Sequence, residues 1–166
     1  MKTQRRPNWT VFLLLLLAAV VFIHKTGQRL PELMAAHFDA SGAASGYMMR
    51  SSYLTFMSAI AAGVPLFIAL LQSLAIRQAT SLRIPNRDYW LAEERREDTQ
   101  AYLNLQGMRF GLLLAAFLCY VHWLVVQGNA AQPPRLSNAM FIPALVFFLL
   151  VTGLWAGSFY FHFRRP

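Results

Sequence analysis

The sequence predicts an all-α integral membrane protein: a four-helix bundle with a short extracytoplasmic helix-turn cap between helices 1 and 2, as one domain over residues 1–166. Composition is the first reason, because 57% of the residues are hydrophobic and only 13% are charged. Soluble domains carry about 25% charged residues. The second reason is that the charges are clustered and leave four long uncharged runs between them. A membrane-spanning helix needs about 20 mostly apolar residues, and these runs supply that length.

The first uncharged run predicts helix 1 over about residues 8–24, with Trp9 as an anchor in the headgroup zone. A cleaved signal peptide is the alternative, because the basic MKTQRR precedes an apolar stretch. HKTGQRL follows that stretch directly, without the small-residue pattern of a cleavage site. We therefore favour an uncleaved first helix.

The other three runs predict helix 2 at about 52–76, helix 3 at about 108–127 and helix 4 at about 138–162. Pro65 lies inside helix 2, where the loss of a backbone donor favours a kink. Gly153 and Gly157 form a GxxxG pattern in helix 4, which lets two helix backbones approach closely. We expect this pair to pack within the chain, with a homodimer face as the alternative.

The positive-inside rule sets the expected orientation. With the N-terminus in the cytoplasm, only four of the 15 lysines and arginines fall outside, namely Lys25, Arg29, Arg50 and Arg135. Both termini are then cytoplasmic, the cap at 25–50 is outside, and a loop and helix at 77–107 are inside. The basic residues behind the net charge of +8 flank the apolar runs. They therefore indicate membrane topology and lipid-headgroup contacts and not nucleic-acid binding. The lipid bilayer is accordingly the first expected partner.

The outside segment predicts one or two helical turns. Pro31 and Glu32 are typical of a helix start. Apolar residues and one histidine then follow at spacings of three and four: Leu30, Leu33, Met34, His37 and Phe38. Asp39 with Gly42, and then Gly46 with Tyr47, predict two turns after this helix.

The inside segment predicts a turn at Pro85 and Asn86, then a helix with Asp88 as its N-cap. This helix either continues into helix 3 as a solvated element or offers residues 88–106 to a cytoplasmic partner. Tyr89 and Trp90 belong to the same short loop motif.

The outside segment also resembles a known family. Leu30-Pro31, His37-Phe38-Asp39, Gly42 and Gly46-Tyr47, placed between two spanning helices, resemble the bacterial "domain of unknown function 1648". The stretch Ile84 to Ala92 is similar to one found in some of its members. The domain also occurs in SdpI-type immunity and signalling proteins, which protect producer cells from a secreted toxin and hold a repressor at the membrane. Those proteins carry additional spanning helices, and the acidic residue before the second glycine of their motif is Ser45 here.

Chemical motifs are few. Glu32, His37 and Asp39 are acceptable metal ligands, but each also has a local structural explanation, so we expect no metal and no cofactor. His122 and Gln72, near helix ends, are either functional or wetted at the interface. The sequence contains no GxSxG, no HExxH and no phosphate loop, so an enzyme is not expected.

The predicted function is therefore a non-catalytic protein of the bacterial cytoplasmic membrane, a sensor, regulator or immunity-like protein. Its motif at 30–50 would recognise an envelope peptide or protein, and self-association is allowed. A small transporter or transporter subunit and a structural membrane subunit without ligand are the alternatives.

Overall fold

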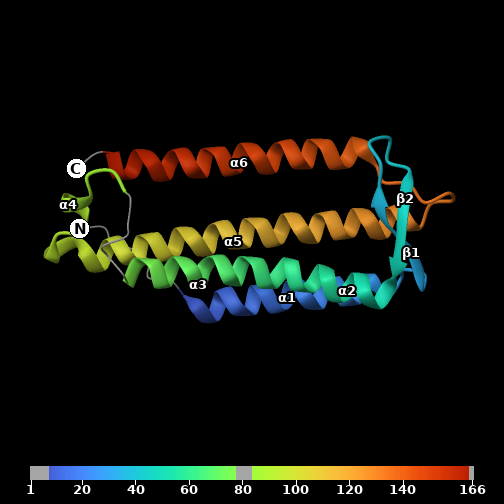
Figure 1. Ribbon diagram of the computed structural model, residues 1–166, viewed down its shortest axis with the longest axis horizontal. Helices are drawn as coiled ribbons and strands as arrows, with labels where there is room; N and C mark the ends of the chain where they lie inside the picture. Colours follow the sequence, from blue (N-terminus) through green and yellow to red (C-terminus); the bar gives the residue numbers. More distant parts are fainter. Residues whose placement is uncertain (1–7, 78–83, 165–166) are drawn as a thin grey trace.

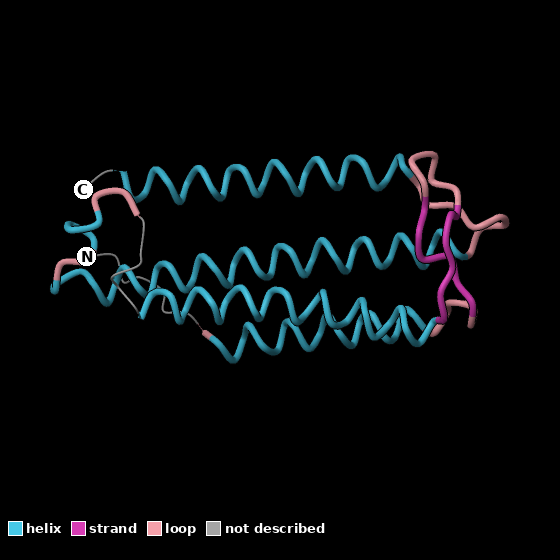
Figure 2. The backbone as a smooth tube through the Cα atoms, viewed as in Figure 1, coloured by secondary structure: helices cyan, strands magenta, loops and turns pink. Residues whose placement is uncertain are grey.

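The computed structural model describes residues 8–77, with backbone only at 75–77, and residues 84–164. Within them the helices are α1 (Trp9–Gly27), α2 (Arg50–Ser58), the π-helix η1 (Ala59–Gly63), α3 (Val64–Arg77), α4 (Arg87–Trp90), α5 (Glu93–Asn129) and α6 (Asn138–Arg164). The strands are β1 (Leu33–Phe38) and β2 (Ala44–Met49). The start of α1, α4 and the end of α6 lie toward one end of the molecule, and the strands lie across the other end (Figures 1 and 2).

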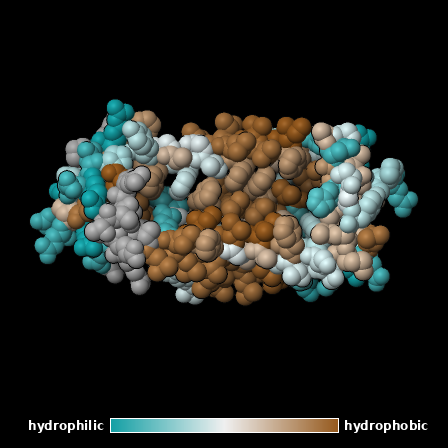
Figure 3. All heavy atoms as spheres, viewed as in Figure 1, coloured by the Kyte–Doolittle hydropathy of each residue, from teal (hydrophilic) through white to brown (hydrophobic). Residues whose placement is uncertain are grey.

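Four helical segments are long and apolar enough to cross a membrane: Trp9–Gly27, Arg50–Leu74, Glu93–Asn129 and Asn138–Arg164. Figure 3 shows a hydrophobic band across the middle of the face in view, with hydrophilic residues toward both ends. The chain is thus a multi-pass helical membrane protein. Of the basic residues behind the predicted orientation, some lie outside the described residues: Lys2, Arg5, Arg6, Arg83 and Arg165.

The central helix of the bundle is α5, which contacts α1, α3 and α6. Two glycines with four-residue spacing, Gly107 and Gly111, make its contact with α3 close. A Cβ on Gly107 would collide with the Gln72 side chain, and one on Gly111 would lie 3.3 Å from Pro65. A small-residue contact that the sequence analysis did not predict therefore joins α5 to α3.

The packing role predicted for Gly153 and Gly157 is wrong. A Cβ built on either glycine meets no atom within 4 Å. The side of α6 that faces α5 carries aromatic residues instead, with Phe148 stacked on Phe117 and Trp155 stacked on Phe110 at centroid distances of 4.4 and 5.0 Å. Because bulky rings fill this contact, the helix backbones have no need of small residues there.

The helix irregularity expected at Pro65 lies one turn earlier. The π-helix η1 occupies Ala59–Gly63, and Pro65 is the second residue of α3. Pro65 has no N–H to donate to a carbonyl of the preceding turn, and its ring crowds that turn. The π-turn therefore takes up the disturbance that proline would cause in a continuous α-helix.

The inner helix and the third span are one helix, α5, which begins at Glu93 and not near residue 108. Asp88 is not its N-cap, because it lies in the first turn of the short α4, and Ala92 caps α5. No proline or glycine occurs between Glu93 and Gln106, so nothing in this stretch stops the helix.

The predicted helix-turn cap is a β-hairpin, and the helix expected from Leu30 to Phe38 is wrong. β1 pairs antiparallel with β2, with Leu33 opposite Met49 and Ala35 opposite Tyr47. Met34 and Phe38 satisfy a spacing of four, but they also satisfy the two-residue period of a strand. A helix of two turns would leave most of its terminal backbone groups unpaired, whereas a second strand pairs them.

Candidate functional site

The hairpin turn is built by Asp39 and Gly42. The Asp39 carboxylate accepts hydrogen bonds from the Ser41 hydroxyl at 2.7 Å and from the backbone N–H groups of Ser41 and Ala43 at 2.8 and 3.1 Å. The Ser41 hydroxyl, followed by the Ala43 N–H, holds the pKa of the Asp39 carboxyl below its usual value. Gly42 has a φ of +83°, and a Cβ there would collide with the Leu136 carbonyl. Both motif residues therefore serve the turn.

Asn129 fixes the hairpin to the end of α5. Its amide accepts from the Ala35 N–H at 2.8 Å and donates to the Ala35 carbonyl at 2.9 Å. It also donates to the Val125 carbonyl at 2.9 Å. The amide thus supplies the two hydrogen bonds that a neighbouring strand would have supplied.

The hairpin tip is bound to the connection between α5 and α6. The Leu136 N–H donates to the Gly42 carbonyl at 2.8 Å. Asn138 donates to the Ala40 carbonyl at 2.8 Å and Arg135 to the Ser41 carbonyl at 3.2 Å. Since these contacts all involve backbone of the tip, they fix its position whatever its side chains.

The two faces of the hairpin differ. On the inner face Met34 is buried, and Phe38 and Met48 pack against the cluster formed where α1, α2 and α5 end. On the outer face the side chains of Leu33, Tyr47 and Met49 are 60%, 55% and 53% exposed. The outer face is therefore an apolar and aromatic surface, and we name it the outer hairpin face.

Gly46 of the motif lies opposite His37. A Cβ on Gly46 would lie 3.2 Å from both Cβ and Nδ1 of the histidine. The glycine therefore leaves room for the exposed imidazole. Pro31, also exposed, precedes β1.

The metal hypothesis for Glu32, His37 and Asp39 finds no support in the geometry. In the part of the chain that the structure describes, no three His, Cys, Asp or Glu side chains come together. The Asp39 carboxylate is occupied by the turn instead.

A buried polar chain joins three helices beneath the hairpin. The Tyr53 hydroxyl lies 3.1 Å from His122 Nδ1, and the Thr26 hydroxyl lies 2.8 Å from Nε2. Because the Thr26 hydroxyl lies 2.7 Å from the Phe22 carbonyl, we assign its hydrogen to that bond, so that it accepts from Nε2–H. His122 thus has a hydrogen-bond partner at each ring nitrogen, and it connects α1, α2 and α5 with no exposed surface.

At the opposite end, the predicted loop motif caps α6. Asn86, with a left-handed φ of 51°, donates to the carbonyls of Phe163 and Arg164 at 3.2 and 2.8 Å. The Trp90 indole donates to the same Phe163 carbonyl at 3.1 Å. These bonds satisfy helix-end carbonyls that have no partner within the helix. Asp88 and Tyr89 remain exposed, and the Arg95 guanidinium lies 4.0 Å from the centre of the Tyr89 ring.

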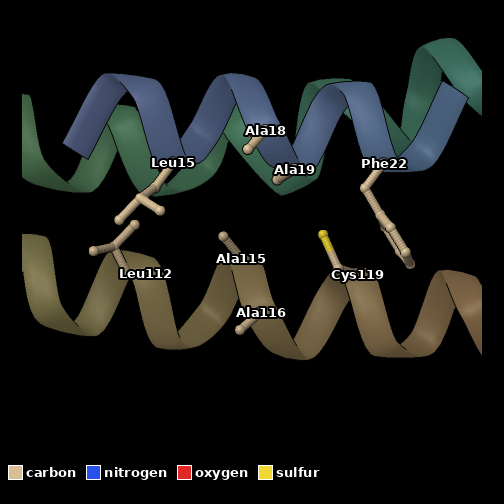
Figure 4. A pocket seen from close by; sticks show the side chains of 8 residues that line it. All are labelled: Leu15, Ala18, Ala19, Phe22, Leu112, Ala115, Ala116 and Cys119. Carbon is tan, nitrogen blue, oxygen red and sulfur yellow. The ribbon is translucent and has the colours of Figure 1, made fainter. Parts of the chain in front are cut away.

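An apolar groove with a volume of about 390 Å³ lies between α1 and α5 at the level of the membrane. Figure 4 shows alanines on both helices along it, with the Cys119 sulfur directed from α5 toward α1. A second groove of about 290 Å³ lies between α5 and α6. The residues that line both grooves are mostly apolar, like those of the lipid-facing surface around them.

Sequence reasoning found the turn at Asp39 and Gly42. It was wrong about a second turn at Gly46 and Tyr47, which lie inside β2, and it missed the groups that hold the hairpin in place. Asn129 and Asn138 each lie at an end of an apolar run, which is a signal for a helix end but not for a strand partner. Comparison with known proteins finds no matching family model, no similar curated protein and no similar solved structure.

Proposed function

We propose that the protein is a non-catalytic sensor, regulator or immunity-like protein of the bacterial cytoplasmic membrane. Both termini lie in the cytoplasm in this proposal, and the hairpin lies outside. The outer hairpin face recognises an envelope peptide or protein. The resemblance of the hairpin motif to the domain of unknown function 1648 and the distribution of basic residues support this assignment.

The observation that carries the proposal is a fixed hairpin with an unfilled outer face. Asn129, Arg135 and Asn138 hold its backbone, so its shape does not depend on the exposed side chains. Leu33, Tyr47 and Met49 are more than half exposed on this rigid support. Exposed aromatic and apolar side chains at fixed positions are what a recognition surface requires, because little ordering entropy is lost on binding.

Helix α6 supplies a connection between the two ends. Its first residue, Asn138, bonds to the hairpin tip, and its last residues accept bonds from Asn86 and Trp90. A rigid helix tied to both elements couples a displacement of the hairpin to the inner loop. The exposed residues Asp88 and Tyr89, with the start of α5, then form the surface for a cytoplasmic partner within 88–106.

Photo-crosslinking from an exposed position of the hairpin in living cells tests the proposal. A photoreactive amino acid at His37 is expected to capture a defined envelope peptide or protein. The same group at Leu154, which is 75% exposed on α6, is the lipid-facing control. Leu33→Ser should reduce the capture at least tenfold, with no change in thermal unfolding. His37 is a better position than Asp39, whose substitution would disturb the turn.

Capture of lipid alone from both positions would contradict recognition at the hairpin. The chain would then be a structural membrane subunit.

A further inference from the structure

The outer edge of β2 carries backbone groups that point away from the hairpin. Ala35 gives both its N–H and its C=O to Asn129, on the side of β1 away from β2. Residues opposite one another in an antiparallel pair direct these groups either both toward or both away from each other. Tyr47, which is opposite Ala35, therefore directs its N–H and C=O away from β1.

At its other end, this same edge is already paired with the segment that precedes α6. Ala43 forms an antiparallel bridge with Arg135, and the Leu136 N–H donates to the Gly42 carbonyl at 2.8 Å. The pairing stops there because α6 begins at Asn138. Within the described residues, the sheet has no third strand beside Ser45 to Met49.

The side chains of β2 give this edge no protection, and the register shifts of the hairpin are confined to Ala35 to Phe38, opposite residues 44–47. Natural edge strands carry lysine, proline or inward-pointing charge, which prevent pairing with another chain. β2 reads ASGYMM and has none of these. Its exposed side chains are small, aromatic or apolar, and all fit beside a neighbouring strand.

We propose that β2 pairs antiparallel with β2 of a second copy of this chain, centred on Tyr47, so that two hairpins form one four-stranded sheet. The two-fold axis of such a pair stands perpendicular to the sheet. Since the inner hairpin face lies on the ends of α1, α2 and α5, that axis runs along the helices (Figure 2). Copies inserted in one orientation in a membrane have this symmetry, and it places both edges at the same depth.

The pairing uses the edge of β2 and not the outer hairpin face. It therefore goes beyond the recognition role and stands independently of it. The joined sheet would present two outer faces side by side, directed away from the membrane.

Disulfide crosslinking tests the register. In a Cys119→Ala background, each introduced cysteine is the only one in the chain. Across the two-fold axis, Tyr47 pairs with itself at a Cα separation of about 5.5 Å, which is within the range for a disulfide. Tyr47→Cys in lipid vesicles, treated with a mild oxidant, should give a covalent dimer whose yield does not fall on dilution with lipid.

Two further variants fix the arrangement. In this register the two Met49 residues lie on opposite sides of the axis, about 13 Å apart. Met49→Cys should therefore not crosslink, although Met49 is as exposed as Tyr47. Leu33→Cys, equally exposed but on β1, should remain monomeric.

A monomeric Tyr47→Cys protein would overturn the proposal and leave the edge to a peptide of another protein. Equal crosslinking by Leu33→Cys would also overturn it, since that result indicates collision. Neither result bears on capture from His37, so failure of the dimer and failure of recognition are distinguishable.

Discussion

Two glycine pairs with the same spacing have different surroundings in this protein. Gly107 and Gly111 on α5 lie against Gln72 and Pro65 of α3, while Gly153 and Gly157 on α6 face open space. The same pattern thus marks a helix contact in one place and an unfilled surface in the other. A small-residue pattern states what approach is sterically allowed, and the neighbouring helix decides whether that approach occurs.

Of the substitutions that test this comparison, Gly111→Val should lower the free energy of unfolding most. The added side chain would meet Pro65 at 3.3 Å and Phe12 at 3.4 Å, between three helices. Overpacking of this kind destabilises proteins by about 1–3 kcal/mol. A matched Gly157→Val variant should unfold like the parent. Unfolding in mixed micelles measures both, and equal effects would contradict the packing difference.

Trp155→Phe should have the next largest effect, because α6 contacts α5 through this residue and not through its glycines. The indole donates to the side-chain amide oxygen Oε1 of the buried Gln106 at 3.1 Å, and phenylalanine leaves that oxygen without its donor. An unsatisfied buried acceptor costs about 1–3 kcal/mol.

A double-mutant cycle with Gln106→Met isolates this bond. Additive losses of unfolding free energy would show that Trp155 contributes by packing alone.

Gly107→Ala should destabilise by about 1 kcal/mol, less than Gly111→Val, since the side chain that it meets is flexible. Gln72 would have to move, and its hydrogen bond to the Leu103 carbonyl, now 2.9 Å, would weaken. In a Gln72→Ala background, Gly107→Ala should leave the free energy of unfolding almost unchanged. An undiminished loss there would mean that the backbone, and not Gln72, limits the space.

Gly153→Ala should have the smallest effect and the opposite sign. Alanine is a better helix former than glycine by up to about 1 kcal/mol, and the added methyl group meets nothing. The midpoint of unfolding should stay constant or rise slightly. A clear loss, concentration-dependent in the membrane, would instead favour the α6 glycines as a homodimer face.

The candidate site shows the same limit of local pattern. The sequence predicted turns at Asp39 with Gly42 and at Pro85 with Asn86, because turn chemistry is local. It did not predict that Asn129 would bond to Ala35, or that Asn86 would bond to Phe163, because these partners are 94 and 77 residues apart. The buried chain of Thr26, His122 and Tyr53 was not predicted for the same reason, because its members are also far apart in the sequence.

The sequence by itself determined the four apolar segments and the approximate positions of their ends. Whether an apolar run can span the hydrocarbon core of a membrane depends on its length and composition, and both are local properties of the sequence. The tertiary structure alone decided that Leu33 to Phe38 form a strand, because a strand exists only where a partner satisfies its backbone, and that partner is β2 on one side and Asn129 on the other. It also decided which glycines pack and which loop caps α6, since each depends on what another helix brings into contact.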